Sequence, residues 1–221
     1  MSGFSTARQK MVDGQVRTCD VTDARIIDAM LAVPREVFVP AKQRSLAYLD
    51  LDLDVSDGGS VKRYLIKPAV TARLLQAAEI GDTDNVLVVG CATGYVAALA
   101  ARLAAQVTAT EGVSALAERA RDILGHLGVG NVVVKAAAAA DGDSANGPYD
   151  VIVLNGATEV APTGLYRQLK EHGRLVGVFA LAKPARAILV THSHGDFGNR
   201  ALFDAVAPVL PGLERLPAFV F

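Results

Sequence analysis

Five short runs of valine, isoleucine and leucine, separated by helical stretches, dominate the chain after Asn85. We expect strands at 86–89, 107–110, 132–135, 151–154 and 175–179, with helices at 94–104, 114–128 and 162–169. Strands that are apolar throughout, rather than alternately apolar and polar, are typical of a parallel sheet covered on both faces. The segments from 187 and from 201 predict two or three further strands, which we expect to be antiparallel. The pattern therefore predicts a doubly wound α/β fold with ligands beyond the carboxyl ends of its strands.

The first part of the chain, up to about residue 80, is expected to be helical and irregular. Thr22 is the predicted N-cap of a helix that ends at Val33, because the residue before a proline leaves the helical region. A second helix is predicted over 67–80, with Pro68 in its first turn. We interpret 1–221 as one domain, with a helical segment at 1–80 and an α/β core at 81–221.

Composition excludes several classes of protein. The formal net charge of −1 does not favour general nucleic-acid binding. Two cysteines, Cys19 and Cys91, suit a reducing compartment, so we expect a cytoplasmic protein. Arg102 and Gln106 interrupt the apolar run at 86–110, and the N-terminus has no apolar signal region, so neither a membrane span nor a signal peptide is expected. The oligomeric state stays open.

The segment NVLVVGCATGY, at 85–95, predicts a strand, a tight turn and a helix at the first strand of the sheet. Its glycines are Gly90 and Gly94, and Ala92 stands at the second glycine of a dinucleotide-binding fingerprint. Glu111 ends the second strand about twenty residues after Gly90, where an acid can accept hydrogen bonds from both hydroxyls of a ribose. The alternative is that Glu111 caps the next helix, although Ser114 is better placed for that. The spacing favours a nucleoside-cofactor loop.

Three further features of the sequence are candidate sites. The alternating leucine and aspartate at 51–54 are either an exposed acidic strand or cation ligands, and the mismatch with a calcium loop favours the exposed strand. His192 and His194 share one face of a strand but lack a third ligand at convincing spacing, so we expect them to be exposed. Cys91 is either a reactive thiol or, as we favour, a small packed residue. No metal site is predicted.

The chain resembles a known family through motifs in order and at matching spacing. Residues 33–40, VPREVFVP, followed by LAYLD, are similar to the N-terminal signature of protein-L-isoaspartate O-methyltransferases. The segment VLVVGCATGYVAALAARLA resembles their first S-adenosylmethionine motif, and the match continues through VTATEGVSALAERARDILGHLGVGNVVV, GPYDVIVLNGATEVAP and LYRQLKEHGRLVG. The resemblance runs from about residue 15 to the C-terminus. It implies a class I methyltransferase fold, a seven-stranded sheet with an N-terminal helical extension, and isoaspartyl groups of damaged proteins as substrate.

The resemblance also implies S-adenosylmethionine as methyl donor and a set of residues around it. These are Gly90, Cys91, Ala92, Thr93, Gly94, Tyr95, Glu111, Gly112, Ala138 and Asn155. Two of them depart from the family pattern. Ala92 replaces the middle glycine, where a Cβ penalises positive φ, and Ala138 falls where the family has an aspartate that resembles an acceptor for the adenine amino group. Asp141 and Asp143 lie near enough in sequence to be replacements. We therefore expect cofactor binding that is weakened or lost.

The substrate side departs further. The family's Thr-Ile-Ser-x-Pro stretch corresponds to Tyr64–Pro68 here, with Ile66 at the Ser position and Lys67 beside it. No catalytic residue is assigned, because an ionised carboxylate needs no general base near pH 7 and methyl transfer is mostly positioning. Lys62, Arg63 and Lys67 either attract a substrate carboxylate or form an exposed basic face, and we favour the exposed face.

Three functions follow from these residues. The first is S-adenosylmethionine-dependent methylation of isoaspartyl carboxylates, with weak activity. The second is a non-catalytic binding protein that keeps the fold with an eroded cofactor site. The third is a methyltransferase with a changed substrate.

Overall fold

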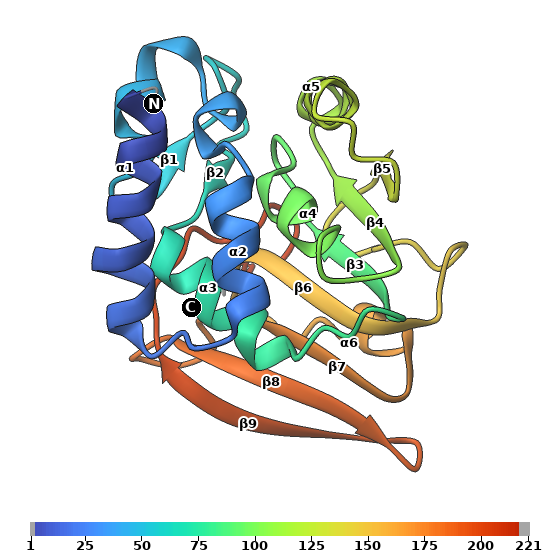
Figure 1. Ribbon diagram of the computed structural model, residues 1–221. Coiled ribbons are helices and arrows are strands. Elements are labelled where there is room, and N and C mark those ends of the chain that lie inside the picture. The colour runs from blue at the N-terminus through green and yellow to red at the C-terminus, as the bar shows by residue number, and fades with distance from the viewer. Residues whose placement is uncertain (1–2, 217–221) are drawn as a thin grey trace.

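Seven strands form one sheet in the order β5-β4-β3-β6-β7-β8-β9 in the computed structural model, which describes residues 3–216 (Figure 1). The first five strands in sequence are parallel, and β8 and β9 run antiparallel beside β7. Their bounds are β3 Asn85–Val89, β4 Gln106–Glu111, β5 Val132–Ala136, β6 Tyr149–Thr158, β7 Leu169–Phe179, β8 Arg186–Ser193 and β9 Asp196–Asp204. The predicted sheet is confirmed, including the antiparallel tail.

Both faces of the sheet are covered, which explains the continuous apolar strands. Along β3, Val86 and Val88 join the core on one face, while Leu87 and Val89 join the core on the other. The first face packs against α3 Pro68–Ala78, α4 Tyr95–Ala100 and α5 Ser114–His126. The second face is covered by α6 Thr163–Tyr166 and by Leu210 and Leu213 from the C-terminal segment.

Two predicted helices are shorter than expected. Helix α4 ends at Ala100 instead of residue 104, since the chain then turns through short-range hydrogen bonds from Arg102 to Leu99 and from Leu103 to Ala100. Helix α6 has four residues, because the chain at Leu169 already pairs with Tyr149 as the start of β7. Tertiary pairing therefore overrides the helical pattern at this point.

The N-terminal segment packs on the α-helical side of the sheet, as Figure 1 shows. Its elements are α1 Gly3–Met11, the single π turn η1 Val12–Val16, the 3-10 turns η2 Arg17–Cys19, η3 Arg35–Phe38 and η4 Ala41–Leu46, and α2 Ala24–Ala32. Helix α2 ends before Pro34, as predicted. Its N-cap is Asp23 rather than Thr22, because the Asp23 carboxylate accepts a hydrogen bond from the Arg25 backbone N–H.

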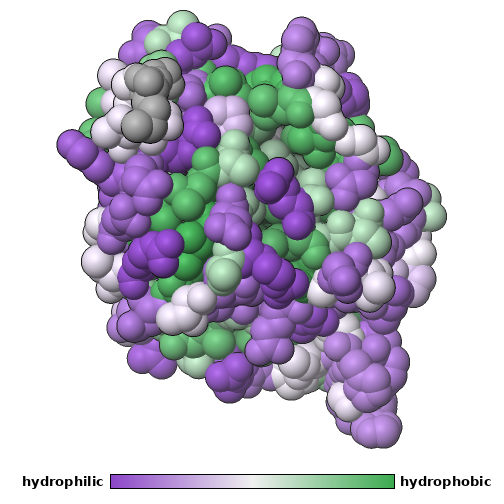
Figure 2. Space-filling model, in the orientation of Figure 1, coloured by the Kyte–Doolittle hydropathy of each residue, from purple (hydrophilic) through white to green (hydrophobic). Residues whose placement is uncertain are grey.

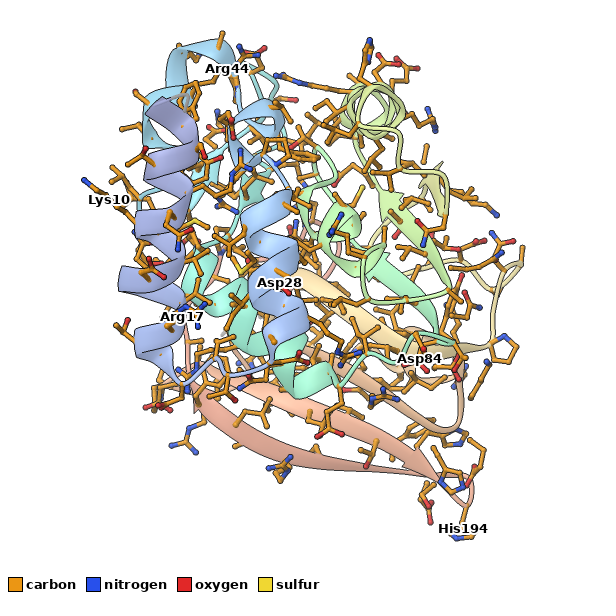
Figure 3. All side chains as sticks on the ribbon, viewed as in Figure 1. Lys10, Arg17, Asp28, Arg44, Asp84 and His194 are labelled. Carbon is orange, nitrogen blue, oxygen red and sulfur yellow. The ribbon has the colours of Figure 1, made fainter. Side chains whose placement is uncertain are left out.

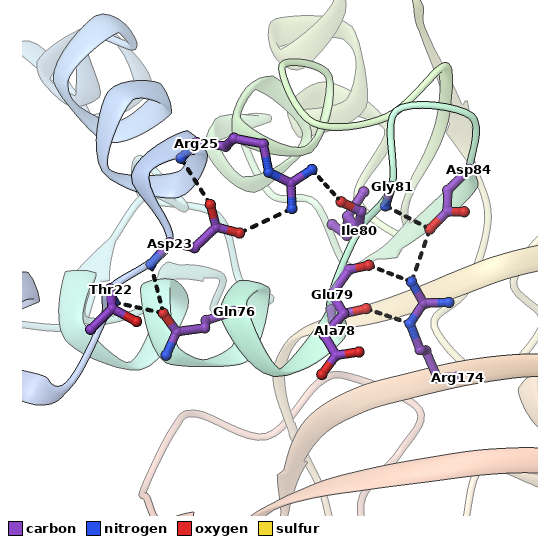
Figure 4. Close-up of polar contacts among 10 residues, drawn as sticks. All are labelled: Thr22, Asp23, Arg25, Gln76, Ala78, Glu79, Ile80, Gly81, Asp84 and Arg174. Atoms are coloured by element: carbon purple, nitrogen blue, oxygen red, sulfur yellow. Dashed lines mark hydrogen bonds and ion pairs between the residues drawn. The ribbon is translucent and has the colours of Figure 1, made fainter.

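Hydrogen bonds tie this segment to the sheet through α3 and the turn after it (Figure 4). The Gln76 side chain accepts from the backbone of Thr22 and Asp23. On the opposite side, the Arg174 guanidinium of β7 donates to the carbonyls of Ala78 and Glu79. The end of α3 is therefore held from both directions.

The leucine and aspartate stretch is only partly a strand. Strand β1 is Leu53–Asp54, and it pairs with β2, Tyr64–Leu65. Leu51 is 46% exposed whereas Leu53 is 3% exposed, so the alternation does not separate apolar from acidic faces. Asp52 instead accepts a hydrogen bond from the Lys67 N–H, and burial raises the pKa of its carboxyl. The expected exposed acidic strand is wrong for this reason.

The β8–β9 hairpin projects from the body of the molecule, and hydrophilic side chains cover its tip (Figure 2). His194 lies at this tip, in view at the lower right of Figure 3. His192 is not exposed as we expected, because its ring stacks on Phe197 and hydrogen-bonds the Lys170 carbonyl. Within residues 3–216, no group of three potential ligands lies in position to hold a metal ion. No helix in the same range is long and apolar enough to span a bilayer.

Candidate functional site

The candidate site lies where the strand order reverses, between β3 and β6, at the carboxyl ends of the parallel strands. A cavity of about 290 Å³ opens there, and we call it the Gly90 cavity. It is lined by Val61, Arg63, Gly90, Glu111, Gly112, Val113, Ala138, Ala139, Leu210, Pro211 and Gly212. Four of the predicted cofactor residues therefore meet at one surface: Gly90, Glu111, Gly112 and Ala138.

The loop from Gly90 to Gly94 turns through three residues with positive φ. Gly90 has φ +68°, Ala92 has +52° and Gly94 has +99°. Ala92 thus occupies the left-handed conformation that favours glycine, at a cost of roughly 1 kcal/mol for its Cβ. Its backbone N–H donates to a Glu111 carboxylate oxygen at 2.7 Å. Ala92 is therefore accommodated with strain in the conformation that favours glycine.

Glu111 is buried at the end of β4, with 1% of its side chain exposed. Its Oε2 accepts from the Ala92 N–H and its Oε1 accepts from the Val113 N–H at 3.1 Å. The Arg63 Nε donates to both oxygens, at 3.0 and 3.1 Å. Three N–H groups therefore contact this carboxylate, which has about four lone-pair sites, and the Arg63 Nε–H is shared between both oxygens. Glu111 thus contacts the N-cap of α5, but its main partners are the glycine loop and Arg63.

The expectation that Arg63 is part of an exposed basic face is wrong. Its side chain is 2% exposed and reaches across the cavity to the Gly90 carbonyl, with an Nη2–O distance of 2.7 Å. Lys62, the residue before it, points the other way and pairs with Asp54 at the surface. The neighbouring ammonium and guanidinium groups therefore have opposite surroundings.

Leu210 fills the remaining space above Gly90. A Cβ built on Gly90 would lie 2.5 Å from Leu210 Cδ2 and 2.6 Å from Arg63 Nη2. Gly156 of β6 has the same neighbour, since its Cβ would lie 2.9 Å from Leu210. A Cβ at Gly90 would therefore displace the ends of two side chains, and a Cβ at Gly156 would also press on the Pro208 carbonyl.

Several predicted cofactor residues face away from the Gly90 cavity. Thr93 donates its hydroxyl to the Phe38 carbonyl at 2.6 Å, and Tyr95 packs edge-on against the Phe38 ring and under the Arg35 guanidinium. Cys91 is buried, and burial followed by the Glu111 charge raises the pKa of its thiol well above the ordinary range. Its packing agrees with the interpretation as a small core residue.

Asn155 and Ile66 come together on the other side of the glycine loop. The Asn155 amide donates to the Gly90 carbonyl at 2.8 Å, and its Oδ1 is buried without a partner among the described residues. Ile66 and Asn155 line an internal void that has no room for a water molecule. The Ile66 carbonyl accepts from buried Arg35. Tyr64 pairs in β2 beside it, and Lys67 precedes α3, so neither lines the Gly90 cavity.

The proposed replacements for the missing acceptor at Ala138 do not reach the cavity. Asp143 pairs with Lys135 at 3.0 Å and accepts from Asn146, and although burial opposes it, these contacts hold the pKa of its carboxyl below the ordinary value. Neither Asp141 nor Asp143 is among the residues that line the cavity. The surface at Ala138 is therefore apolar.

Solved structures with the same arrangement define the class of protein. A protein-L-isoaspartate O-methyltransferase aligns with a TM-score of 0.83 at 25% identity, over 94% of this chain and 67% of that one. A Plasmodium falciparum protein solved with S-adenosyl-L-homocysteine aligns with a TM-score of 0.77 at 16% identity, over 95% and 99% of the two chains. The fold is that of the class I methyltransferases.

The family model described as Protein-L-isoaspartate(D-aspartate) O-methyltransferase matches residues 6–191. The chain therefore belongs to the protein-L-isoaspartate O-methyltransferase family. A relative of that name from Koribacter versatilis is 40% identical over 80% of this chain and 78% of its own length. Another from Roseiflexus sp. (strain RS-1) is 35% identical over 87% and 86%.

Two residues of the site were not foreseen in these positions. Arg63 follows a stretch rich in glycine and serine, which predicts an exposed loop, and its partner Glu111 is 48 residues away. Leu210 belongs to an irregular tail that is held by a parallel bridge between Ala157 and Val209 and by a hydrogen bond from the Glu159 N–H to the Leu213 carbonyl. Neither pairing leaves a periodic signal in the sequence.

Proposed function

We propose that this chain is an S-adenosylmethionine-dependent O-methyltransferase that acts on isoaspartyl carboxylates in proteins, with weak activity. The observation that carries the proposal is the Glu111 carboxylate, which lies at the carboxyl end of β4 against the glycine loop that follows β3. The names of the relatives at 40% and 35% identity support the same reaction and the same class of substrate.

The Gly90 cavity suits the nucleoside part of this cofactor in most respects. Glu111 has the carboxylate that ribose hydroxyls require, and Gly112, Ala138 and Ala139 leave an apolar surface for a base. Two features oppose tight binding: Ala138 has no acceptor for adenine, and Arg63 already occupies the Glu111 carboxylate. These features support weak rather than tight binding.

The chain's part in the reaction is to hold and orient the two reactants. The cofactor, when bound, supplies an activated methyl group. An isoaspartyl carboxylate is ionised near pH 7 and needs no general base, so its position relative to the methyl group sets the rate. Ile66 stands where the family has a serine hydroxyl, which supports slow transfer because one positioning hydrogen bond is missing.

Two assays test this proposal together. Calorimetric titration with S-adenosylhomocysteine measures cofactor binding, and methyl-ester formation on an isoaspartyl peptide measures the reaction. We expect Ala138→Asp to bind more tightly than the wild type by restoring an acceptor, and Ala140→Asp, in the same alanine run but outside the cavity lining, to bind unchanged. No heat up to millimolar ligand with any of the three proteins would rule out the methyltransferase function. Robust esterification by the wild type would contradict the weak activity.

A non-catalytic binding protein is the second candidate. The observation that favours it is that the chain's own donors, Arg63 among them, already contact both oxygens of Glu111. Under this hypothesis Ala138→Asp has no effect, and no methyl ester forms even at high enzyme concentration.

A further inference from the structure

The segment 56–63, between β1 and β2, delivers one buried side chain into the candidate site. The backbone of Arg63 is held at both ends of its peptide unit, since its carbonyl accepts from the Val55 N–H and its N–H donates to the Ser56 hydroxyl. The rest of the segment is exposed from Asp57 to Lys62. Arg63 is therefore the anchor of an otherwise solvent-facing loop.

The Arg63 side chain contacts the two groups that a nucleoside ligand would need, the Glu111 carboxylate and the Gly90 backbone. Its guanidinium contacts both oxygens of Glu111 and the carbonyl of Gly90. With the N–H groups of Ala92 and Val113, it places three donors on Glu111, and its own N–H lies across both oxygens. A ribose that approached both oxygens of this carboxylate would therefore have to displace the Arg63 guanidinium.

The Arg63 side chain also packs against Gly90, on the side where a Cβ would stand in any other residue. The Arg63 Nη2 atom lies 2.6 Å from the position of a Cβ on Gly90, which is well inside contact distance. The space that glycine provides for close approach of a ligand is thus filled by this side chain together with Leu210.

We propose that Arg63 is an internal occupant of the cofactor site, and that S-adenosylmethionine binds only to the conformation in which segment 56–63 has moved out. The inference rests on the proposed function. Surface pairs hold the loop only loosely, because Asp57 contacts Lys42 at 3.9 Å and Arg119 at 3.5 Å with more than half of its side chain exposed. Gly58, at φ +89°, and Gly59 give the loop a flexible centre.

The energetic consequence is a reduced apparent affinity. A ligand that binds only a minor conformation has its dissociation constant raised by the inverse of that conformation's population. The guanidinium thus acts as a specificity-determining group: any ligand must offer hydroxyl or other donors to Glu111 that compete with a charged partner in contact with both oxygens.

The test compares three proteins by calorimetric titration with S-adenosylhomocysteine. Arg63→Gln removes the charge and the fork of donors, and we expect it to bind about 10-fold more tightly than the wild type. Lys62→Gln is the matched control, because it makes the same change one residue away on an exposed side chain, and we expect it to bind like the wild type. Equal or weaker binding by Arg63→Gln would overturn the inference, and weaker binding would make Arg63 a ligand of the cofactor instead.

A second measurement follows the wild type, with a conservative variant used only to assign the signal. The Arg63 Nε–H signal in a ¹⁵N spectrum, identified by its absence from Arg63→Lys, is expected to be protected from exchange in the free protein and to lose that protection on saturation with S-adenosylhomocysteine. Retained protection in the saturated complex would refute the displacement. If none of the three proteins in the titration binds the ligand, the proposed function fails and the inference with it, whereas equal binding by all three refutes the inference alone.

Discussion

The two ends of the parallel sheet use the same kinds of charged groups in different ways. At the amino ends, Arg174 and Asp84 pair with 22% and 16% of their side chains exposed, and Asp150 pairs with the more exposed Lys170. At the carboxyl ends, Arg63 and Glu111 pair with 2% and 1% exposed. The Arg174–Asp84 pair tethers neighbouring elements (Figure 4), whereas Arg63 and Glu111 line the Gly90 cavity, where we propose that a ligand binds. The position of a charged pair on the sheet, rather than its residue types, therefore determines whether the pair only links neighbouring elements or lies in the candidate ligand site.

The largest effect is expected from removing the buried carboxylate. Glu111→Ala should lower the free energy of unfolding by about 3 kcal/mol, because two buried N–H groups and a guanidinium lose their acceptor. Asp84→Ala at the amino end should lose only about 1 kcal/mol, since water replaces part of its interactions. Urea unfolding measures the free energy of unfolding of both variants, and equal losses would contradict the difference between the two ends of the sheet.

A smaller effect is expected from the tether itself. Arg174→Ala should lose about 2 kcal/mol, because it donates to two carbonyls and to Asp84 while only partly exposed. The control is Arg186→Ala, whose pair with Asp204 is more than half exposed and should contribute close to nothing. Thermal unfolding of both variants at one salt concentration would test this, and a loss at Arg186 equal to that at Arg174 would contradict it.

The smallest effect concerns pH. Although burial opposes it, the Asn85 N–H and Lys170 hold the pKa of Asp150 below its ordinary value. A carboxyl whose pKa is lower when folded contributes stability above its unfolded pKa of about 3.9, and loses it as the pH falls through the folded pKa. Asp150→Asn should therefore be less stable than the wild type by about 0.5 kcal/mol at pH 6, and the difference should shrink as the pH falls below the unfolded pKa. A difference that does not shrink with falling pH would contradict the charge effect.

The predicted fold and the observed fold agree where burial on both faces dictates the residue types. Runs such as 86–89 and 151–154 carry that signal locally, and both fall within strands of the sheet. Helix lengths agreed less well, because α6 gives way to the pairing of Leu169 with Tyr149. Local composition cannot encode where a distant strand begins its pairing.

In the candidate site, too, some residues were predictable from the sequence and others were not. Gly90 and Glu111 were predictable, since their spacing follows from the geometry of one strand–helix–strand unit. The role of Arg63 was not, because a charged residue at the end of a glycine- and serine-containing loop carries no mark of burial. Its environment is created by the fold, which brings together groups from residues 63, 90 and 111.

The C-terminal segment also has a consequence for synthesis of the protein. Leu210, which covers both Gly90 and Gly156, leaves the ribosome after every strand of the sheet has been made. Because a domain generally folds as a unit, the sheet and its glycine loop are completed only when this last segment is available. Gly90 and Gly156 thus gain their cover from the part of the domain that is synthesised after the strands it closes.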